Sequence, residues 1–188
     1  PLLGQEYEVL PLEETVNSRA YHEMSPVINR RGDRLYFTRM GSPDFDRTLI
    51  EDSLHLHETL NEGEYRRYLR DIYGQLAGQP VSNPVSSAFN QDIWFANLTD
   101  SARIESVHHP AYPLNNALPN SVAALSPFSD ELILINQFPK EGGMQKGYSL
   151  SRKLGDTAWA YPEPMDIRHY YNSGTDVNLT MSIDGSVL

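Results

Sequence analysis

Histidine is the first side chain to consider for chemistry in this chain, because the sequence contains six histidines and no cysteine. Two close pairs are candidate metal ligands, His55-x-His57 and His108-His109. Residues two positions apart on a helix point to different faces, and no carboxylate completes a recognised spacing such as H-E-x-x-H. We therefore interpret these histidines as surface or partly buried side chains, and the sequence predicts no metal ligand.

Carboxylates are abundant, yet their spacing does not define a site. Four of them gather in one short stretch of the chain: Asp44, Asp46, Glu51 and Asp52. This stretch lacks the central glycine and the distal glutamate of a calcium-binding loop, so we interpret it as a solvated, charged loop. A glycosidase needs two facing carboxylates, but a chain with 25 acidic residues always permits such a pair, so their presence carries no information.

Nucleophilic catalysis finds no support in the sequence either. The chain has no thiol and no G-x-S-x-G segment, which would place a reactive serine on a sharp turn. Arg31-Gly32-Asp33 spells an adhesion tripeptide, but it coincides with a predicted turn, and turn chemistry explains it. Asp92 precedes an apolar strand, where an aspartate commonly accepts hydrogen bonds from backbone N–H groups, so we assign it a structural role. The sequence therefore predicts no catalytic residue and no cofactor.

The overall composition narrows the class of protein. The 188 residues carry 25 acidic and 15 basic side chains, a formal net charge of −10, which argues against a nucleic-acid groove. No apolar run approaches the roughly 18 residues that cross a bilayer, so we do not expect a membrane-spanning protein. With 13 prolines, 12 glycines and 11 tyrosines, the chain favours short β-strands joined by turns.

Three segments of the chain share one layout. They open on Val16-Asn17-Ser18, Leu114-Asn115-Asn116 and Tyr171-Asn172-Ser173. In each segment an apolar strand, a tight turn and a second apolar strand follow, which is the pattern of a β-hairpin. The hairpins cover 24–38, 122–135 and 177–188, and their turns carry the structural residues Gly32, Asp184 and Gly185.

Further strands complete these units. A third strand is predicted at 92–96 in the first unit and at 147–151 in the second, where a fourth strand begins at 159–161. The two tryptophans, Trp94 and Trp159, are expected to pack between neighbouring units. Four short strands that recur at intervals of about 50 residues are typical of the blades of a β-propeller.

These repeats resemble the WD40-like repeat of TolB-type β-propellers, in which S-P-D-G-x-x-L-Y-F is followed by D-I-W. The V-N-S, L-N-N and P-E-P segments make the chain similar to periplasmic propellers of outer-membrane proteins, which are often joined to a C-terminal OmpA-like, peptidoglycan-binding domain. Such proteins occur in Gram-negative bacteria that use type IX secretion and gliding machinery. The resemblance covers 12–38 and 90–188, and it departs from the pattern where Arg31 and Phe128 replace aspartate and Ser129 replaces glycine.

The predicted fold is therefore all-β, a β-propeller fragment of about two and a half four-stranded blades with a helical insertion in the first blade. The first blade covers about 12–110, with the insertion at 42–89, the second covers about 111–166, and the third begins over about 167–188. Because a propeller closes only with several blades, commonly four to eight, we expect the remaining blades to lie outside these residues.

The insertion is predicted to form a helical hairpin. Apolar side chains recur at helical spacing over 62–76, and a weaker helical pattern precedes them over 49–60. The apolar face of the stronger helix either packs on the propeller or is exposed and binds a partner, since interface cores favour Tyr and Arg. The candidate partner-binding residues are Tyr65, Arg66, Tyr68, Leu69, Ile72 and Tyr73.

The resemblance implies a non-catalytic periplasmic scaffold that mediates protein–protein contacts in an outer-membrane-associated assembly, such as type IX secretion or gliding. Its partners would be other envelope proteins, with peptidoglycan anchoring through a domain outside this chain. Two other functions stay open: a domain of a hydrolase, such as a glycosidase or a prolyl-oligopeptidase-like peptidase, and a carbohydrate-binding propeller that uses exposed Tyr and Trp. A downstream domain with a serine elbow, or inward-facing carboxylates on the innermost strands, would favour the hydrolase.

Overall fold

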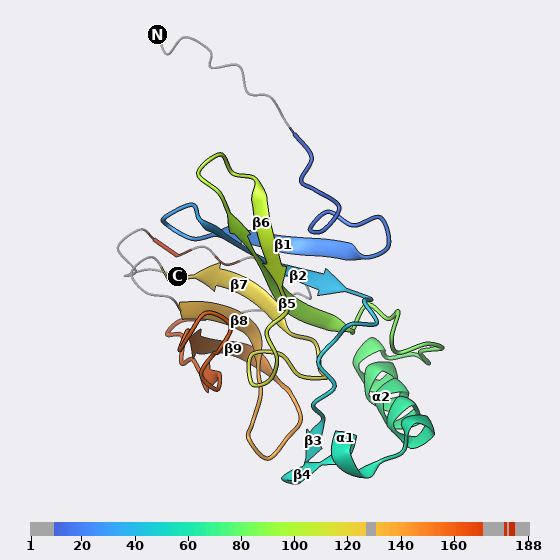
Figure 1. Ribbon diagram of the computed structural model, residues 1–188. Helices are drawn as coiled ribbons and strands as arrows, with labels where there is room; N and C mark the ends of the chain where they lie inside the picture. The colour runs from blue at the N-terminus through green and yellow to red at the C-terminus, as the bar shows by residue number, and fades with distance from the viewer. Residues whose placement is uncertain (1–9, 127–130, 171–178, 180, 183–188) are drawn as a thin grey trace.

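Two four-stranded antiparallel sheets form the framework of the protein (Figure 1). The computed structural model describes residues 10–126, 131–170, 179 and 181–182. The strands of the first sheet are, in order, β1 (His22–Ile28), β2 (Arg34–Met40), β5 (Gln91–Leu98) and β6 (Ile104–His108). Those of the second sheet are β7 (Ser121–Leu125), β8 (Glu131–Gln137), β9 (Gln145–Arg152) and β10 (Glu163–Pro164). Each sheet is a meander with its strands in chain order, and the described structure is mostly β, as expected for an all-β protein.

Alternation along β5 shows how the first sheet is buried. Ile93 and Phe95 project from one face of the sheet and Trp94 and Ala96 from the other, because successive side chains of a strand point to opposite faces. All four side chains are buried. A strand covered on both faces needs no polar side, which explains why its sequence is continuously apolar.

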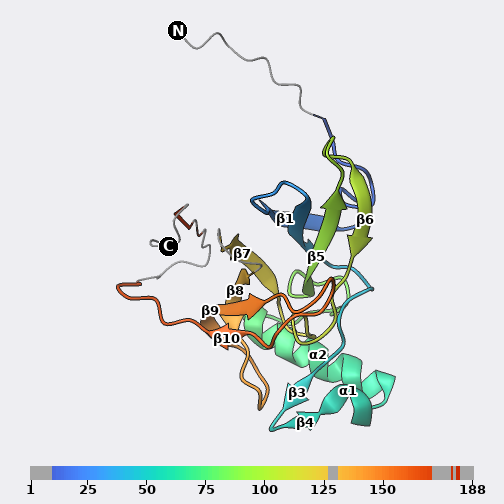
Figure 2. The same ribbon diagram turned by 60° about the vertical axis from the view of Figure 1, so that its left-hand side comes forward.

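The second sheet covers one of these two faces. Its strand β7 lies against β1, β2 and β5, and Figure 2 shows the two sheets from a second direction. The core between the sheets is formed by Tyr36, Ile93, Phe95, Leu114, Val122, Leu132, Leu134 and Trp159. The ring of Trp159 lies edge-on to Tyr36, with 5.9 Å between the ring centroids. The position expected for Trp159, between two units, is confirmed.

Trp94 lies on the opposite face of the first sheet from Trp159. It lies on the face of the first sheet that points away from the second sheet, in a cluster with Val16, Leu35 and Phe37. Packing of Trp94 against another blade stays a prediction, but Trp94 does not lie between the two described sheets. The reason is its place in the strand, one residue out of phase with Ile93, which faces the second sheet.

The turn between β1 and β2 follows the prediction. Gly32 has a left-handed φ of +75°, and its N–H donates to Asn29 O at 2.9 Å. The Asn29 side chain accepts hydrogen bonds from the N–H groups of Asp33 and Arg34, which stabilises the turn. The tripeptide at 31–33 is thus part of a hairpin turn, as the sequence indicates.

The fourth strand of the second sheet begins later than expected. Segment 159–161 makes only a bridge between Trp159 and Lys153, and β10 starts at Glu163. Pro162 stands between the two and has no N–H to donate to a ladder, which explains the interruption. The turn of the third repeat, with Asp184 and Gly185, lies outside the described residues.

The first half of the insertion is not the helix that was expected. β3 (Ile50–Glu51) and β4 (Leu54–His55) form a small hairpin, and α1 (Leu56–Thr59) is a single helical turn. Asp52 and Ser53 both have positive φ, and a two-residue turn of this kind reverses the chain between paired strands. The predicted helical hairpin is therefore wrong in its first limb.

The second half is the helix that the sequence predicts, α2 (Glu62–Ala77). It begins with a capping box, in which the Asn61 side chain accepts the N–H of Glu64 and the Glu64 carboxylate accepts the N–H of Asn61. It ends at Gly78, which is left-handed. Within the described part of the chain, no helix is long and apolar enough to cross a membrane.

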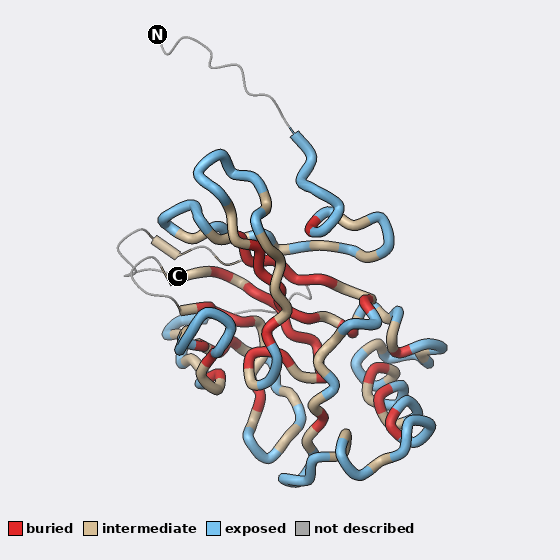
Figure 3. The backbone as a smooth tube through the Cα atoms, viewed as in Figure 1, coloured by how far each residue is buried: buried red, intermediate tan, exposed pale blue. Residues whose placement is uncertain are grey.

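The insertion lies at one end of both sheets, next to the connections that follow β6 and β8 (Figures 1 and 2). Its apolar side chains share a cluster with Ala117 and Leu118 from the first connection and with Phe138 from the second. The β3–β4 hairpin also bonds the β8–β9 connection, through Ser53 N–H to Glu141 O and Gly143 N–H to Ile50 O. Figure 3 shows the buried residues continuing from the strands into the inner side of α2.

Candidate functional site

The inner face of α2 is a packing surface. Tyr65, Leu69 and Tyr73 are at most 2% exposed. The Tyr65 hydroxyl donates to Arg47 O at 3.1 Å and the Tyr73 hydroxyl donates to Ala117 O at 2.6 Å. Burial raises the pKa of both phenols above the ordinary value. These three side chains hold the helix against the protein, so the prediction that they contact a partner is wrong.

One flank of α2 remains accessible. Tyr68 and Ile72, also predicted partner residues, are only partly buried, and with Leu76 they line a groove of about 240 Å³. Leu118 and Met144 form the opposite wall of the groove, next to the connections of the two sheets. The insertion therefore presents an apolar groove directly beside the face through which it packs.

The arginine side chains of α2 differ in their contacts and in their exposure to solvent. Arg66 pairs with Glu62 one turn earlier, and Arg47 contacts the same carboxylate at 2.6 Å. Hydrogen bonds from Arg47 and Arg66 hold the pKa of Glu62 below its usual value. Arg67 and Arg70 are exposed to solvent. Arg66, the only arginine among the predicted partner residues, is thus engaged within the insertion, and its two neighbours form the basic part of the outer surface.

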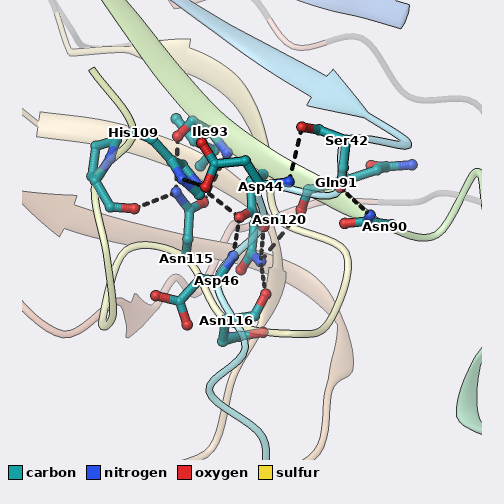
Figure 4. A network of polar contacts seen from close by, with 12 residues as sticks. Ser42, Asp44, Asp46, Asn90, Gln91, Ile93, His109, Asn115, Asn116 and Asn120 are labelled. Atoms are coloured by element: carbon teal, nitrogen blue, oxygen red, sulfur yellow. Dashed lines mark hydrogen bonds and ion pairs between the residues drawn. The ribbon is translucent and has the colours of Figure 1, made fainter. Parts of the chain in front are cut away.

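A buried polar network lies where the insertion meets β5 (Figure 4). At its centre is Asp92, which is 2% exposed. The Asp92 carboxylate accepts a hydrogen bond from the N–H of Asp46 and lies 2.7 Å from His109 Nε2 and 3.5 Å from Asn120 Nδ2. Asp46 in turn accepts the N–H of Tyr112 at 2.8 Å. The network thus joins the start of the insertion to the β6–β7 connection.

His109 is held on three sides. Its ring stacks on Trp94, with 4.3 Å between ring centroids and 4° between ring planes. Nε2 faces Asp92, and Nδ1 lies 3.7 Å from a carboxylate oxygen of Asp44. Burial raises the pKa of Asp92 to about 6, and hydrogen bonding to His109 opposes that rise. Asp92 is therefore a carboxyl group that titrates well above the ordinary acidic range.

Around this centre, asparagine side chains form the hydrogen bonds to backbone groups that a neighbouring strand would otherwise form. Asn115 accepts the N–H of Ile93 and donates to Ile93 O, both at 2.8 Å, as a neighbouring strand would. Asn90 donates to Ser42 O at 2.7 Å and to Val85 O, which closes the base of the insertion. The polar contacts therefore hold the two ends of the insertion together beside the first sheet.

This network can do two things: it anchors the insertion beside the first sheet, and its buried carboxyl group binds a proton. An imidazole oriented by a carboxylate is the general base of many hydrolytic sites. In the described chain, however, the second ring nitrogen of His109 faces Asp44 rather than a hydroxyl group. Asp92 accepts a backbone N–H, as predicted, but its partner is Asp46, 46 residues away, rather than a residue of an adjoining turn.

The sequence does not reveal the pairing of Asp92 with His109. The two residues are 17 positions apart, and only the hairpin of β5 and β6 brings them together. His108 is partly buried, as expected, and its ring stacks on Phe95 at 4.8 Å between centroids. The one signal in the sequence is the position of Asp92 directly before a continuous apolar strand.

Comparison of the chain with protein-family models, with curated proteins and with solved structures found no match. Its function is therefore inferred from its own residues and geometry.

Proposed function

We propose that the chain forms blades of a TolB-type β-propeller that acts as a non-catalytic scaffold for protein–protein contacts. Support for the blades comes from the two sheets, each with four antiparallel strands in meander order, which pack face to face. Leu179 and Met181, from the third repeat, pack against the outer face of the second sheet. A third blade would occupy this position.

The asparagine that opens the second repeat supports the same proposal. Asn115 binds the backbone of Ile93 in the third strand of the first sheet. The first residues of the second repeat are therefore hydrogen-bonded to the preceding sheet. Asn17 and Asn172 occupy the same position in the other repeats. In a complete propeller Asn17, which is exposed here, would bind the blade that precedes this one.

The groove beside α2 is the observation that carries the scaffold function. The helix is held by its buried face against connections of both sheets, so the groove has a fixed shape. A partner that inserts an apolar side chain between Tyr68, Ile72 and Met144 would dock without rearrangement. His109 does not serve as the base of a hydrolase in this arrangement, because both of its ring nitrogens face carboxylates.

We assign this scaffold to the periplasm, in association with the outer membrane, as part of a type IX secretion or gliding assembly. The repeat motifs, which are similar to those of periplasmic propellers, support the assignment. The partners would be other envelope proteins, and attachment to peptidoglycan would come from another domain.

Site-specific photocrosslinking in the native bacterium tests the proposal. One photoreactive residue replaces Gln75, which lines the groove. The control replaces Asp156, which lies with Arg31 and Asp33 of the β1–β2 turn, at the opposite end of the sheets. We expect a single envelope protein, identified by mass spectrometry, to crosslink from Gln75 and not from Asp156.

Substitution in the groove supplies the second arm of this experiment. Leu76→Glu places a charge in the groove at an exposed position and should abolish the adduct from Gln75. Arg67→Ala, on the outer surface of the same helix, is the matched control and should leave the adduct unchanged. An adduct that survives Leu76→Glu, or equal adducts from Gln75 and Asp156, would contradict docking in the groove.

A further inference from the structure

Two histidines and a glutamate meet where β4 leads into α1. His55 ends β4, and His57 and Glu58 belong to the turn of α1. The ligand atoms of the three side chains all lie within 4.8 Å of one another. Glu58 Oε1 lies 4.0 Å from His55 Nδ1 and 3.7 Å from His57 Nε2. The side chains of two residues two positions apart on a helix would point to different faces. That expectation does not apply here, because one histidine is in a strand and the other in a helix.

The backbone behind His57 orients its ring. His57 Nδ1 faces the backbone of Leu49 in either tautomer: it accepts the Leu49 N–H at 3.2 Å in one, and in the other it donates to the Leu49 carbonyl oxygen at 3.3 Å. Metal binding through Nε2 requires the tautomer with hydrogen on Nδ1, in which the ring donates to the Leu49 carbonyl and the lone pair of Nε2 faces Glu58. Metal-binding histidines commonly donate the other ring N–H to a carboxylate, a backbone carbonyl or water.

We propose that His55, His57 and Glu58 form a binding site for zinc or another divalent ion of the same borderline chemistry. Two imidazole nitrogens and one carboxylate oxygen are a ligand set that zinc accepts, with the fourth position left to water or to a group of a partner. Calcium and magnesium require oxygen ligands and are not expected to bind there.

The geometry is close to that of a zinc site. With zinc–ligand bonds of about 2.0–2.1 Å in a tetrahedron, neighbouring ligand atoms are about 3.3 Å apart. The separations of 3.7 Å and 4.0 Å exceed that value by about 0.4 Å and about 0.7 Å, and the two histidine nitrogens lie within 4.8 Å of each other. The side chains of His55 and Glu58 are 48% and 69% exposed, so rotation of these two groups closes the gap without a change in the backbone.

The bound ion would tie β4 to α1 within the insertion. His57 already contacts the backbone of Leu49, whose side chain belongs to the apolar cluster under α2. An ion that restrains His57 should therefore stabilise the insertion against unfolding, since a ligand that binds only the folded state raises its stability. This inference does not depend on the proposed scaffold function.

Metal titration of the tag-free chain tests the site, with cobalt(II) as the spectroscopic probe and zinc(II) as the competitor. We expect the visible absorption of a four-coordinate cobalt ion, at one ion per chain, and its loss when zinc is added. His55→Ala should weaken cobalt binding at least about tenfold, because one of three protein ligands is removed. His22→Ala, which removes an exposed histidine of β1, is the matched control and should bind cobalt as the original chain does.

Thermal unfolding supplies a second readout, independent of the absorption spectrum. Zinc should raise the Tm of the original chain and of His22→Ala but not that of His55→Ala. His57 also bonds the backbone, so His57→Ala could disturb the fold and is interpreted only if its circular dichroism spectrum is unchanged. His55 is exposed and makes no such backbone contact among the described residues, so His55→Ala is the primary variant. Unchanged cobalt affinity in His55→Ala, a cobalt spectrum of the hydrated six-coordinate ion, or equal losses in His55→Ala and His22→Ala would overturn the proposal.

Discussion

Replacement of Asp92 by asparagine should remove a pH dependence that the buried carboxyl group imposes on stability. Burial raises the pKa of Asp92 from 3.8 to about 6. Because the folded-state pKa is above the unfolded value, the folded state binds this proton more tightly than the unfolded chain does. The stabilisation is complete below about pH 4 and is lost as the pH rises through about 6.

The size of the effect follows from the shift in pKa. A rise of about two pKa units corresponds to about 3 kcal/mol, which is a large part of the stability of an ordinary domain. In Asp92→Asn the amide oxygen can still accept the N–H of Asp46, so the anchoring contact remains while the titration disappears. Between about pH 4 and about pH 7, the free energy of unfolding of the original chain should fall by about 2 kcal/mol more than that of the variant.

Urea unfolding at a series of pH values, followed by tryptophan fluorescence, measures this difference. Trp94 stacks on His109, so its emission reports on the network itself. Asp71→Asn, on the exposed side of α2, is the control for the change in net charge and should follow the original chain. Parallel curves for the original chain and Asp92→Asn would refute the claim that burial dominates the titration of Asp92. The claim would also be refuted if the free energy of unfolding of Asp92→Asn fell more steeply towards pH 7 than that of the original chain.

Two matched pairs of substitutions test the contacts that hold the insertion. Gly142 and Gly143 both have positive φ, but a Cβ on Gly142 would clash with the carbonyl oxygen of Ile50, whereas one on Gly143 meets nothing within 4 Å. In urea unfolding, Gly142→Ala should therefore lower the free energy of unfolding by about 1–3 kcal/mol more than Gly143→Ala does. Equal losses of unfolding free energy in the two variants would show that the loop is not in close contact with β3. Leu69→Ala should cost about 2–5 kcal/mol, because it opens a cavity under α2, whereas Leu76→Ala, at a 39% exposed position, should cost less than about 1 kcal/mol. Similar, small losses of unfolding free energy at both leucines would show that α2 is not packed through Leu69.

Much of the β framework can be predicted from the sequence, because its central strands are apolar runs bounded by turn residues. The same is true of α2, whose apolar spacing, capping residue and terminal glycine agree with one another. The first limb of the insertion is different, since Leu49, Ile50 and Leu54 have spacing compatible with a helix. The turn that breaks this pattern is Asp52-Ser53, which lacks the glycine that usually marks a two-residue hairpin turn.

The site is less predictable because distant segments complete it. Helical periodicity shows that Tyr65, Leu69 and Tyr73 share a face, but not that connections far along the chain cover it. A tyrosine that anchors a helix internally looks in sequence like one that contacts a partner. In the same way, His109 reaches Asp92 only through the pairing of β5 with β6, and no local spacing encodes that contact.

The central claim is that the insertion and the two sheets form one cooperative unit, so that the groove beside α2 is fixed relative to the sheets. Native-state amide hydrogen exchange measures this directly, because it gives the opening free energy of each element. We predict that amides of α2 open with the same free energy as those of β5 and β8, and that Leu69→Ala lowers all three values together. Opening of α2 at a much lower free energy, with β5 and β8 unaffected by Leu69→Ala, would contradict the claim.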